Sequence, residues 1–398
     1  MINKEDNHGG AAQMAWNLAA ELRKMGHEVR FIVRRKFSDS GDVHELNENP
    51  LLKWLKIIFR RDFTIVLSSL RDQIMSNDLR YGIEEEIVNH EWLKWADVVH
   101  FHNLHGNYFK LENIIKISKI KKVVWTLHDL WAVTGRCAYP FECNGFENKC
   151  GTCPNLINYQ KMLRDNSRNL LVNKNNIYNK SKLNLVVPSD WMAGNIKKSI
   201  LNKKKCVVIT NAIDPSVYKP LNDKRLVRDE LGLPIDKKII IYFGYGEKNV
   251  NKGWRQFEKV VDYYKNNQNV FFLIIGVKNT VSNNQMKFVE MVYDKEMLVK
   301  YYNCGDMLLY PSLSESFGMV PLEAVACGIL VVAFPVGVIP ELIEHKKNGY
   351  IAKYRDDADL INGVDFILNN KFLRMPKLKD KFIISNMAKE YINSYENA

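Results

Sequence analysis

The chain has 398 residues, of which 46% are hydrophobic and 26% are charged, the balance of an ordinary globular protein. This length exceeds what one compact domain usually holds, so two domains are expected. No apolar run is long enough to cross a bilayer, and residues 1–10 lack the basic start and apolar core of a secretory signal, which predicts a cytoplasmic protein. The net charge of +12 comes from scattered basic residues without the aromatic signatures of RNA-binding domains, so we expect no nucleic-acid partner.

One segment concentrates basic and large apolar side chains. Residues 50–71 combine Trp54 and Phe59 with Lys56 and Arg60. This composition is typical of a helix that lies in a lipid interface, and it predicts peripheral contact with an anionic membrane surface at the inner face of the plasma membrane. A helix that packs on the core and has a solvated basic edge fits the same residues equally well.

Apolar strands alternate with amphipathic helices along almost the whole chain, beginning with a helix over residues 11–25. Strands are expected in the first half over residues 28–33, 98–101, 123–127, 183–187 and 206–210. A polar stretch with Pro215 and Pro220 is typical of a linker. Strands then follow over residues 238–243, 270–275, 307–310 and 330–334. This alternation predicts an α/β fold with two Rossmann-like parallel-sheet domains that face each other across a cleft.

The same pattern sets the expected domain boundaries. Residues 1–213 form the N-terminal Rossmann-like domain, residues 214–375 form the C-terminal one, and residues 376–398 form a C-terminal helix that crosses back to the N-terminal domain. The glycine turn at residues 8–10 has only residues 1–7 before it, and these are too polar for a central strand. We therefore expect either that this domain lacks its first strand or that the true start of the chain lies upstream.

The strongest site signal lies in residues 310–328, YPSLSESFGMVPLEAVACG. A strand ends at Tyr310, a loop carries Glu315, and Gly318 opens a helix that contains Glu323. A helix start presents unpaired amides and the positive end of a dipole, which suits a diphosphate, and a glycine there lets a ligand approach the backbone. Glu323 stands in an otherwise apolar helix, where a carboxylate without a partner is costly, so a ligand role is favoured over a solvated helix face.

This segment resembles the donor-binding signature of the family 4 retaining glycosyltransferases, also called glycosyl transferases group 1, which have the two-domain GT-B fold. Further blocks resemble the family along residues 9–353. They lie at residues 8–11, 126–129, 187–189, 210–214, 243–244, 252–253 and 337–341. Each block is weak alone, but together they are specific.

The resemblance implies a role for individual residues. His128 and Glu315 would be catalytic, with His128 close to the reacting carbon of the donor sugar. Lys252 is a point cation suited to the diphosphate. The donor-binding residues would be Gly9, Gly10, Gly244, Lys252, Ser316, Phe317, Gly318, Met319, Val320 and Glu323.

Two departures or additions accompany this pattern. The family often carries an arginine just after the glycine that follows the first strand of its C-terminal domain, but Tyr245 stands near that point, and Lys248 is the candidate substitute. The segment VVHFHNLH holds His100, His102 and His105, and strand alternation puts the first two on one face. We expect these histidines to line the acceptor side of the cleft, with a metal site as the alternative.

Four cysteines cluster in a long irregular insert over residues 131–159. They are Cys137, Cys143, Cys150 and Cys153. Four thiols that end in C-x-x-C predict a structural zinc site, although the first pair is spaced more widely than in common zinc ribbons. Disulfides and free thiols remain the alternatives for the cluster. The remaining cysteines, Cys206, Cys304 and Cys327, have the character of buried apolar residues.

The family resemblance also implies the overall reaction. The enzyme would move a hexose-type sugar from a nucleoside-diphosphate donor, commonly a UDP-sugar, with retention of configuration and without a catalytic metal or cofactor. The acceptor would be a glycan or a lipid-linked oligosaccharide in surface polysaccharide synthesis. The alternatives are a nucleotide-sugar-binding remnant without transferase activity and another GT-B enzyme, such as a nucleotide-sugar epimerase or a phosphorylase.

Overall fold

The computed structural model describes residues 1–46, 84–106, 108–154, 156, 162–246, 249–278, 283–370 and 375–398. The chain divides into two compact units, one formed by Met1–Thr210 with Met387–Ala398 and the other by Asn211–Asn386. The basic segment over residues 50–71 and Lys248 lie outside the described residues. Within the described ranges, no helix is both long and apolar enough to cross a membrane.

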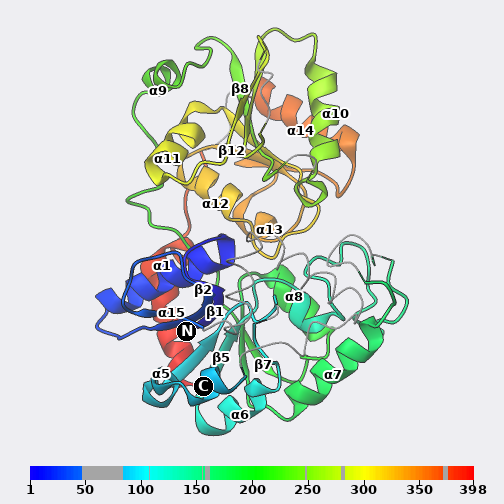
Figure 1. Ribbon diagram of the computed structural model, residues 1–398. Helices are drawn as coiled ribbons and strands as arrows, with labels where there is room; N and C mark the ends of the chain where they lie inside the picture. Colours follow the sequence, from blue (N-terminus) through cyan, green and yellow to red (C-terminus); the bar gives the residue numbers. More distant parts are fainter. Residues whose placement is uncertain are drawn as a thin grey trace, which may run out of the picture. The chain divides into compact units, whose positions relative to one another are not determined.

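The first unit is built on a seven-stranded parallel sheet with the order β3-β2-β1-β4-β5-β6-β7. Its strands are β1 (Ile2–Glu5), β2 (Phe31–Arg35), β3 (Val43–Glu45), β4 (Val98–Phe101), β5 (Lys122–Thr126), β6 (Asn184–Val187) and β7 (Lys205–Val208). Its helices are α1 (Gly10–Lys24), α4 (Glu84–Asn89), α5 (Glu91–Trp95), α6 (Asn113–Ile120), α7 (Ser167–Asn179) and α8 (Asp190–Lys197), with the short η1 (Trp131–Val133). In Figure 1, α1 lies on one face of this sheet and α6 and α7 lie on the other. The central strands are buried on both faces, which is why they are near-continuous apolar runs.

The expectation that the first strand is missing is wrong, because β1 pairs with β2 and β4 in the middle of the sheet. Its buried polar residues are held by hydrogen bonds rather than by apolar packing. The Asn3 side-chain oxygen accepts from the Asn103 amide at 3.2 Å. The carboxylate of Asp6, just after the strand, accepts from the amides of Phe37 and Ser38 at 2.9 Å each. A strand that contains buried polar residues held in this way carries only a weak apolar sequence signal.

The second unit contains a six-stranded parallel sheet with the order β10-β9-β8-β11-β12-β13. Its strands are β8 (Lys238–Phe243), β9 (Val270–Ile275), β10 (Met286–Val289), β11 (Met307–Tyr310), β12 (Leu330–Ala333) and β13 (Gly349–Ile351). Its helices are α9 (Lys224–Glu230), η2 (Val250–Lys252), α10 (Trp254–Tyr264), α11 (Lys295–Cys304), α12 (Met319–Ala326), α13 (Ile339–Leu342), α14 (Asp357–Asn369) and η3 (Asp380–Phe382). Figure 1 shows α10 and α14 on one side of this sheet and α11 and α12 on the other. The predicted α/β fold with two Rossmann-like parallel sheets is thus confirmed.

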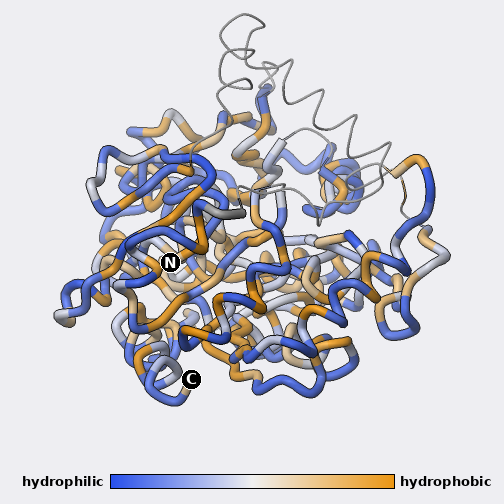
Figure 2. The backbone as a smooth tube through the Cα atoms, turned by 60° about the horizontal axis from the view of Figure 1, so that its bottom comes forward, coloured by the Kyte–Doolittle hydropathy of each residue, from blue (hydrophilic) through white to orange (hydrophobic). Residues whose placement is uncertain are grey.

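The last helix, α15 (Ile384–Glu396), starts in the second unit, and its residues from Met387 onward belong to the first. Ile213 and Ile383 form a parallel bridge in the second unit, so the two passages of the chain between the units lie side by side. Hydrophobic and hydrophilic stretches alternate along the backbone in Figure 2, as buried strands and amphipathic helices follow one another. The described clusters of buried apolar side chains each lie within one unit, two of them in the first unit and one in the second.

Candidate functional site

The start of α12 is the centre of the candidate donor site in the second unit. It follows β11, so it stands at the carboxyl edge of the sheet, where parallel α/β sheets bind ligands. Gly318 caps the helix with φ 103°, a left-handed conformation that favours glycine. A β-carbon at this position would stand 3.1 Å from the Tyr310 hydroxyl, so the backbone there packs tightly against the strand end.

Lys252 and Glu315 meet in front of this helix. The Lys252 Nζ lies 2.6 Å from Glu315 Oε1, and the two side chains are 21% and 10% exposed, so the ion pair is partly shielded from water. The loop that carries Lys252 is fixed because the Leu313 amide donates to Asn251 O at 2.9 Å. Gly253 follows with φ 69°, and a side chain there would collide with the carbonyl oxygen of Pro311. The sequence predicted the cation and the carboxylate separately, and the structure brings them together.

Tyr245 lies beside this pair. Its ring centroid is 5.0 Å from the Lys252 Nζ, in cation–π contact. Burial raises the pKa of its hydroxyl, and the nearby charges of Glu323 and Glu315 raise it further. The neutral phenol therefore stands among the candidate donor residues, near the point where the family often carries an arginine.

Glu323 is half-buried on α12 and already has hydrogen-bond donors. The Tyr302 hydroxyl donates to Glu323 Oε2 at 2.6 Å, and the Tyr218 hydroxyl donates as well. Burial raises the pKa of this carboxyl to about 7, although both tyrosines act in the opposite direction. The acid and its anion are therefore both populated near neutral pH. Sequence reasoning missed the two tyrosines, because they stand far from Glu323 along the chain and match no motif.

The remaining candidate donor residues contribute in different ways. The side chains of Phe317 and Val320 are buried in the apolar core, so only their backbone groups can meet a ligand. The Phe317 carbonyl accepts from the Val338 amide at 2.7 Å, which ties the 337–341 block to the helix start. Ser316 and Met319 are half-buried at the same helix start. Gly244 follows β8, where a β-carbon would collide with the Val277 side chain.

In the first unit, the glycine turn forms the start of α1. Gly9 caps the helix with φ 88°, and no heavy atom lies within 4 Å of a β-carbon built on Gly9 or Gly10. The first turn of α1 holds no acidic side chain. This open helix start leaves its amides accessible to an anionic or hydroxyl-rich ligand.

Three histidines lie close together: His100 lies within β4, and His102 and His128 follow the carboxyl ends of β4 and β5. His102 Nδ1 lies 3.0 Å from His128 Nε2, and the rings of His100 and His102 are 4.1 Å apart. His102 Nε2 is buried and has no hydrogen-bond partner among the described residues. A buried acceptor without a partner costs less than a buried N–H without one, so the proton of His102 belongs on Nδ1 and is donated to His128. This leaves His128 Nδ1–H as the donor available to a ligand.

His128 is neutral at physiological pH. Burial lowers its pKa to about 4, Asp129 opposes this shift, and His105 adds to it. Asp129 itself is paired with His105, whose Nε2 lies 2.9 Å from Asp129 Oδ2. His128 is thus suited to hydrogen bonding with a hydroxyl rather than to carrying a charge.

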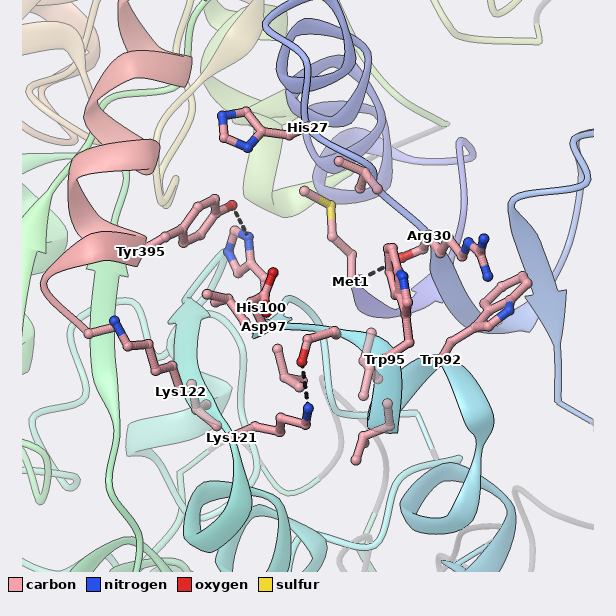
Figure 3. A pocket seen from close by; sticks show the side chains of 18 of the residues that line it. Met1, His27, Arg30, Trp92, Trp95, Asp97, His100, Lys121, Lys122 and Tyr395 are labelled. Atoms are coloured by element: carbon pink, nitrogen blue, oxygen red, sulfur yellow. Dashed lines mark hydrogen bonds between the residues drawn. The ribbon is translucent and has the colours of Figure 1, made fainter.

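A cavity of about 1110 Å³ lies at the opposite edge of the first sheet. Figure 3 shows Met1, Trp95 and His100 among its lining residues, with the Tyr395 hydroxyl bonded to His100. The hollow arises where β1 is paired with β4 only at Ile2, although β4 is paired with β5 along its whole length. Because open parallel sheets bind ligands at their carboxyl edge, we do not place the reaction in this cavity.

Two family models match the chain. The model of Glycosyltransferase Family 4 matches residues 8–217, and the model of Glycosyl transferases group 1 matches residues 223–386. The putative colanic acid biosynthesis glycosyl transferase WcaC of Escherichia coli K12 is 25% identical over 316 residues, which cover 75% of this chain and 76% of that protein.

Solved structures show the same architecture. The sucrose-phosphate synthase of Thermosynechococcus elongatus superimposes with a TM-score of 0.70 at 16% identity, covering 100% of this chain and 97% of that one. HepE of Anabaena in complex with UDP and glucose superimposes with a TM-score of 0.63 at 15% identity, covering 100% and 98%. With both halves matched by these models and the fold shared with such structures, the chain belongs to glycosyltransferase family 4 and is a glycosyltransferase with the GT-B fold.

Proposed function

We propose that the chain transfers a hexose-type sugar from a UDP-sugar to a glycan or lipid-linked oligosaccharide acceptor, with retention of configuration. The bond between the anomeric carbon and the diphosphate oxygen breaks, and the acceptor oxygen bonds to the same face of the sugar. The acceptor proton passes to the leaving diphosphate. The Lys252–Glu315 pair at the start of α12 is the observation that carries this proposal.

The Lys252–Glu315 ion pair supports the proposal because a bound donor can take the place of Glu315 beside Lys252. A donor diphosphate at the start of α12 competes with Glu315 for the ammonium group of Lys252, and the helix amides add to the attraction. When the Lys252 ammonium group pairs with the diphosphate instead, the Glu315 carboxylate is free to accept hydrogen bonds from hydroxyls of the donor sugar. In the first unit, the neutral His128 offers Nδ1–H to a sugar hydroxyl near the reacting carbon.

The relatives motivate the choice of substrates. WcaC is named as a glycosyl transferase of colanic acid biosynthesis, which is why surface polysaccharide synthesis is proposed for this chain. HepE, a protein of the same fold, is solved with UDP and glucose, so UDP-sugars are the first donors to test. The absence of a first strand would have been the reason to consider an inactive remnant. Since β1 is present, that reason does not apply.

The first experiment is thermal denaturation in the presence of a panel of nucleotides and nucleotide-sugars. A bound donor raises the melting temperature by mass action, so UDP-sugars are expected to stabilise the protein more than other nucleotides do. Lys252→Ala is expected to weaken UDP binding about tenfold, equivalent to ~1.4 kcal/mol. Lys265→Ala, which removes an exposed lysine of another helix terminus, is the matched control. Equal UDP affinity in Lys252→Ala and wild type would contradict the donor assignment.

The second experiment determines the product. The anomeric configuration of the new linkage is read by NMR spectroscopy after incubation with the stabilising donor and a glycan acceptor. An inverted product excludes the retaining mechanism. Donor binding without any hydrolysis or transfer, over the whole acceptor panel, would instead support the remnant alternative.

A further inference from the structure

The four clustered cysteines of the insert share one small hollow in the first unit. Cys137, Cys143, Cys150 and Cys153 all line it, and its volume is about 30 Å³. A hollow of this size has room for a small ion or a water molecule. The structure records all seven cysteines of the chain as thiols.

The loops around the hollow are shaped to bring sulfur atoms together. The Gly145 amide donates to Cys143 Sγ at 3.4 Å, and a β-carbon on Gly145 would stand 3.2 Å from Cys143 Sγ and 3.9 Å from Cys150 Sγ. The C-x-x-C turn is pinned on its outer side, since the Gly151 amide donates to Ser167 Oγ at 3.0 Å. The Cys153 amide donates to an Asp165 carboxylate oxygen at 2.7 Å. Hydrogen bonds from backbone amides to a sulfur atom and to supporting side chains are the kind of outer partners that orient metal ligands.

Positive charge lies next to the thiols. Lys174 of α7 is fully buried, and its Nζ donates to the carbonyl oxygens of Trp131 and Thr134 at 2.6 and 3.1 Å. The guanidinium of Arg168 packs against Gly151 in the C-x-x-C turn. A zinc ion with four thiolates carries a net charge of −2, which such cations offset in a partly buried place.

We propose that Cys137, Cys143, Cys150 and Cys153 bind one structural zinc ion. Four sulfur ligands close the tetrahedral coordination, which leaves no position for water or substrate, so the ion orders the insert and does no chemistry. As the side chains are placed, no three His, Cys, Asp or Glu residues in the described ranges could jointly hold an ion. Binding therefore requires the sulfurs to turn toward the centre of the hollow, and each has a single χ1 bond about which it does so.

The zinc ion would support the segment that follows His128 along the chain. The insert begins at Trp131, two residues after Asp129, and the Asp129 carboxylate accepts from the Trp131 amide at 2.8 Å. Lys174 reaches the Trp131 carbonyl from the other side. The order imposed on the cysteine loops is thereby transmitted to the segment that follows the candidate active-site histidine.

The test is the metal content of the full chain purified with reductant and without added metal, measured by plasma mass spectrometry. The expected result is one zinc per chain in the wild type and near-complete loss in Cys143→Ser and Cys150→Ser. Cys206→Ser is the matched control, because this half-buried cysteine lies on β7 outside the cluster. The Cys206→Ser variant is expected to contain as much zinc as the wild type.

A readout on the wild type alone protects the test against variants that fail to fold. Titration with an organomercurial is expected to release one zinc as four thiols react. Wild-type protein without zinc, with iron in its place, or with a Cys–Cys disulfide among the four under reducing purification would overturn the proposal. Zinc retained at the wild-type level by Cys143→Ser or Cys150→Ser would overturn it as well.

Discussion

Glu323 carries a residue-scale prediction on pH. Its pKa is raised from 4.5 to about 7 in the folded protein, mainly by burial, so the folded state holds the proton more tightly than the unfolded chain does. The tighter proton binding of the folded state therefore stabilises the protein at low pH. This contribution to the free energy of unfolding is lost as the pH rises from about 4.5 through 7. Over this window the free energy of unfolding is expected to fall by at most about 3 kcal/mol in the wild type. Glu323→Gln removes this part of the pH dependence.

Urea denaturation at pH 5 and pH 8 measures the effect. Glu344→Gln is the control, because Glu344 lies on the surface beside Lys347 and keeps the wild-type pH dependence. If Glu323→Gln loses as much stability between pH 5 and pH 8 as the wild type does, the raised pKa of Glu323 is wrong. Under the proposed function, in which Glu323 binds the donor, donor affinity is expected to rise over the same pH range, because an ionised carboxylate is the better hydrogen-bond acceptor.

His102 carries the second residue-scale prediction, as a positioning residue that acts through His128. Its Nδ1–H holds His128 Nε2 at 3.0 Å and so fixes which nitrogen of His128 is protonated. His102→Ala is expected to lower kcat about tenfold, ~1.4 kcal/mol, because one hydrogen bond that orients His128 is lost. The KM for the donor should change little.

The His102 prediction is checked by steady-state transfer kinetics with the donor identified by thermal denaturation. His102→Gln retains an amide that can donate to His128 and is expected to recover part of kcat. The exposed His27 provides the control variant His27→Ala. A KM that rises while kcat is unchanged would exclude the positioning role.

At the scale of elements, the strands that the sequence predicts with correct ends are those with continuous apolar runs. Residues 98–101, 238–243, 270–275 and 307–310 match β4, β8, β9 and β11. Their burial on both faces favours apolar side chains at nearly every position, which leaves a strong local signal. The first strand was missed because β1 buries Asn3 within it and Asp6 at its end, and hydrogen bonds to residues far along the chain make that burial affordable.

The same limit applies to the candidate site. The glycines, Lys252, Glu315 and Glu323 could be predicted, since each belongs to a block of local sequence. The partners of these residues could not. The Lys252–Glu315 contact joins residues 63 positions apart, and the Tyr302–Glu323 bond joins two helices. Such pairings depend on how the elements pack, which no local spacing encodes.

The docking of α15 gives an element-scale prediction. The Tyr395 hydroxyl lies 2.8 Å from His100 Nδ1, and the Tyr391 hydroxyl lies 3.0 Å from Thr126 Oγ1, so one partly buried and one buried hydrogen bond hold this helix on the first sheet. Tyr395→Phe and Tyr391→Phe are each expected to lower the free energy of unfolding by ~1 kcal/mol, because each variant loses one of these hydrogen bonds. Chemical denaturation measures the loss, with the exposed Tyr263→Phe as control. An unchanged stability in both variants would show that these bonds do not hold the helix.

At the scale of the whole molecule, each unit has its own apolar core. The described clusters of buried apolar side chains each lie within one of the two units. Two cores joined by short chain passages do not satisfy the conditions for one cooperative transition, so calorimetry is expected to resolve two. Among the candidate donor-binding residues, Gly9 and Gly10 lie in the first unit, and all the others lie in the second.

UDP is therefore expected to raise the temperature of one of the two transitions and to leave the other in place. At a concentration 100 times its Kd, the ligand adds about 2.7 kcal/mol to the unit that binds it. Lys252→Ala should abolish most of this shift, whereas Cys143→Ser should lower only the transition that UDP leaves in place, because the insert belongs to the first unit. An equal shift of both transitions by UDP would contradict the expectation that UDP binds mainly through residues of the second unit.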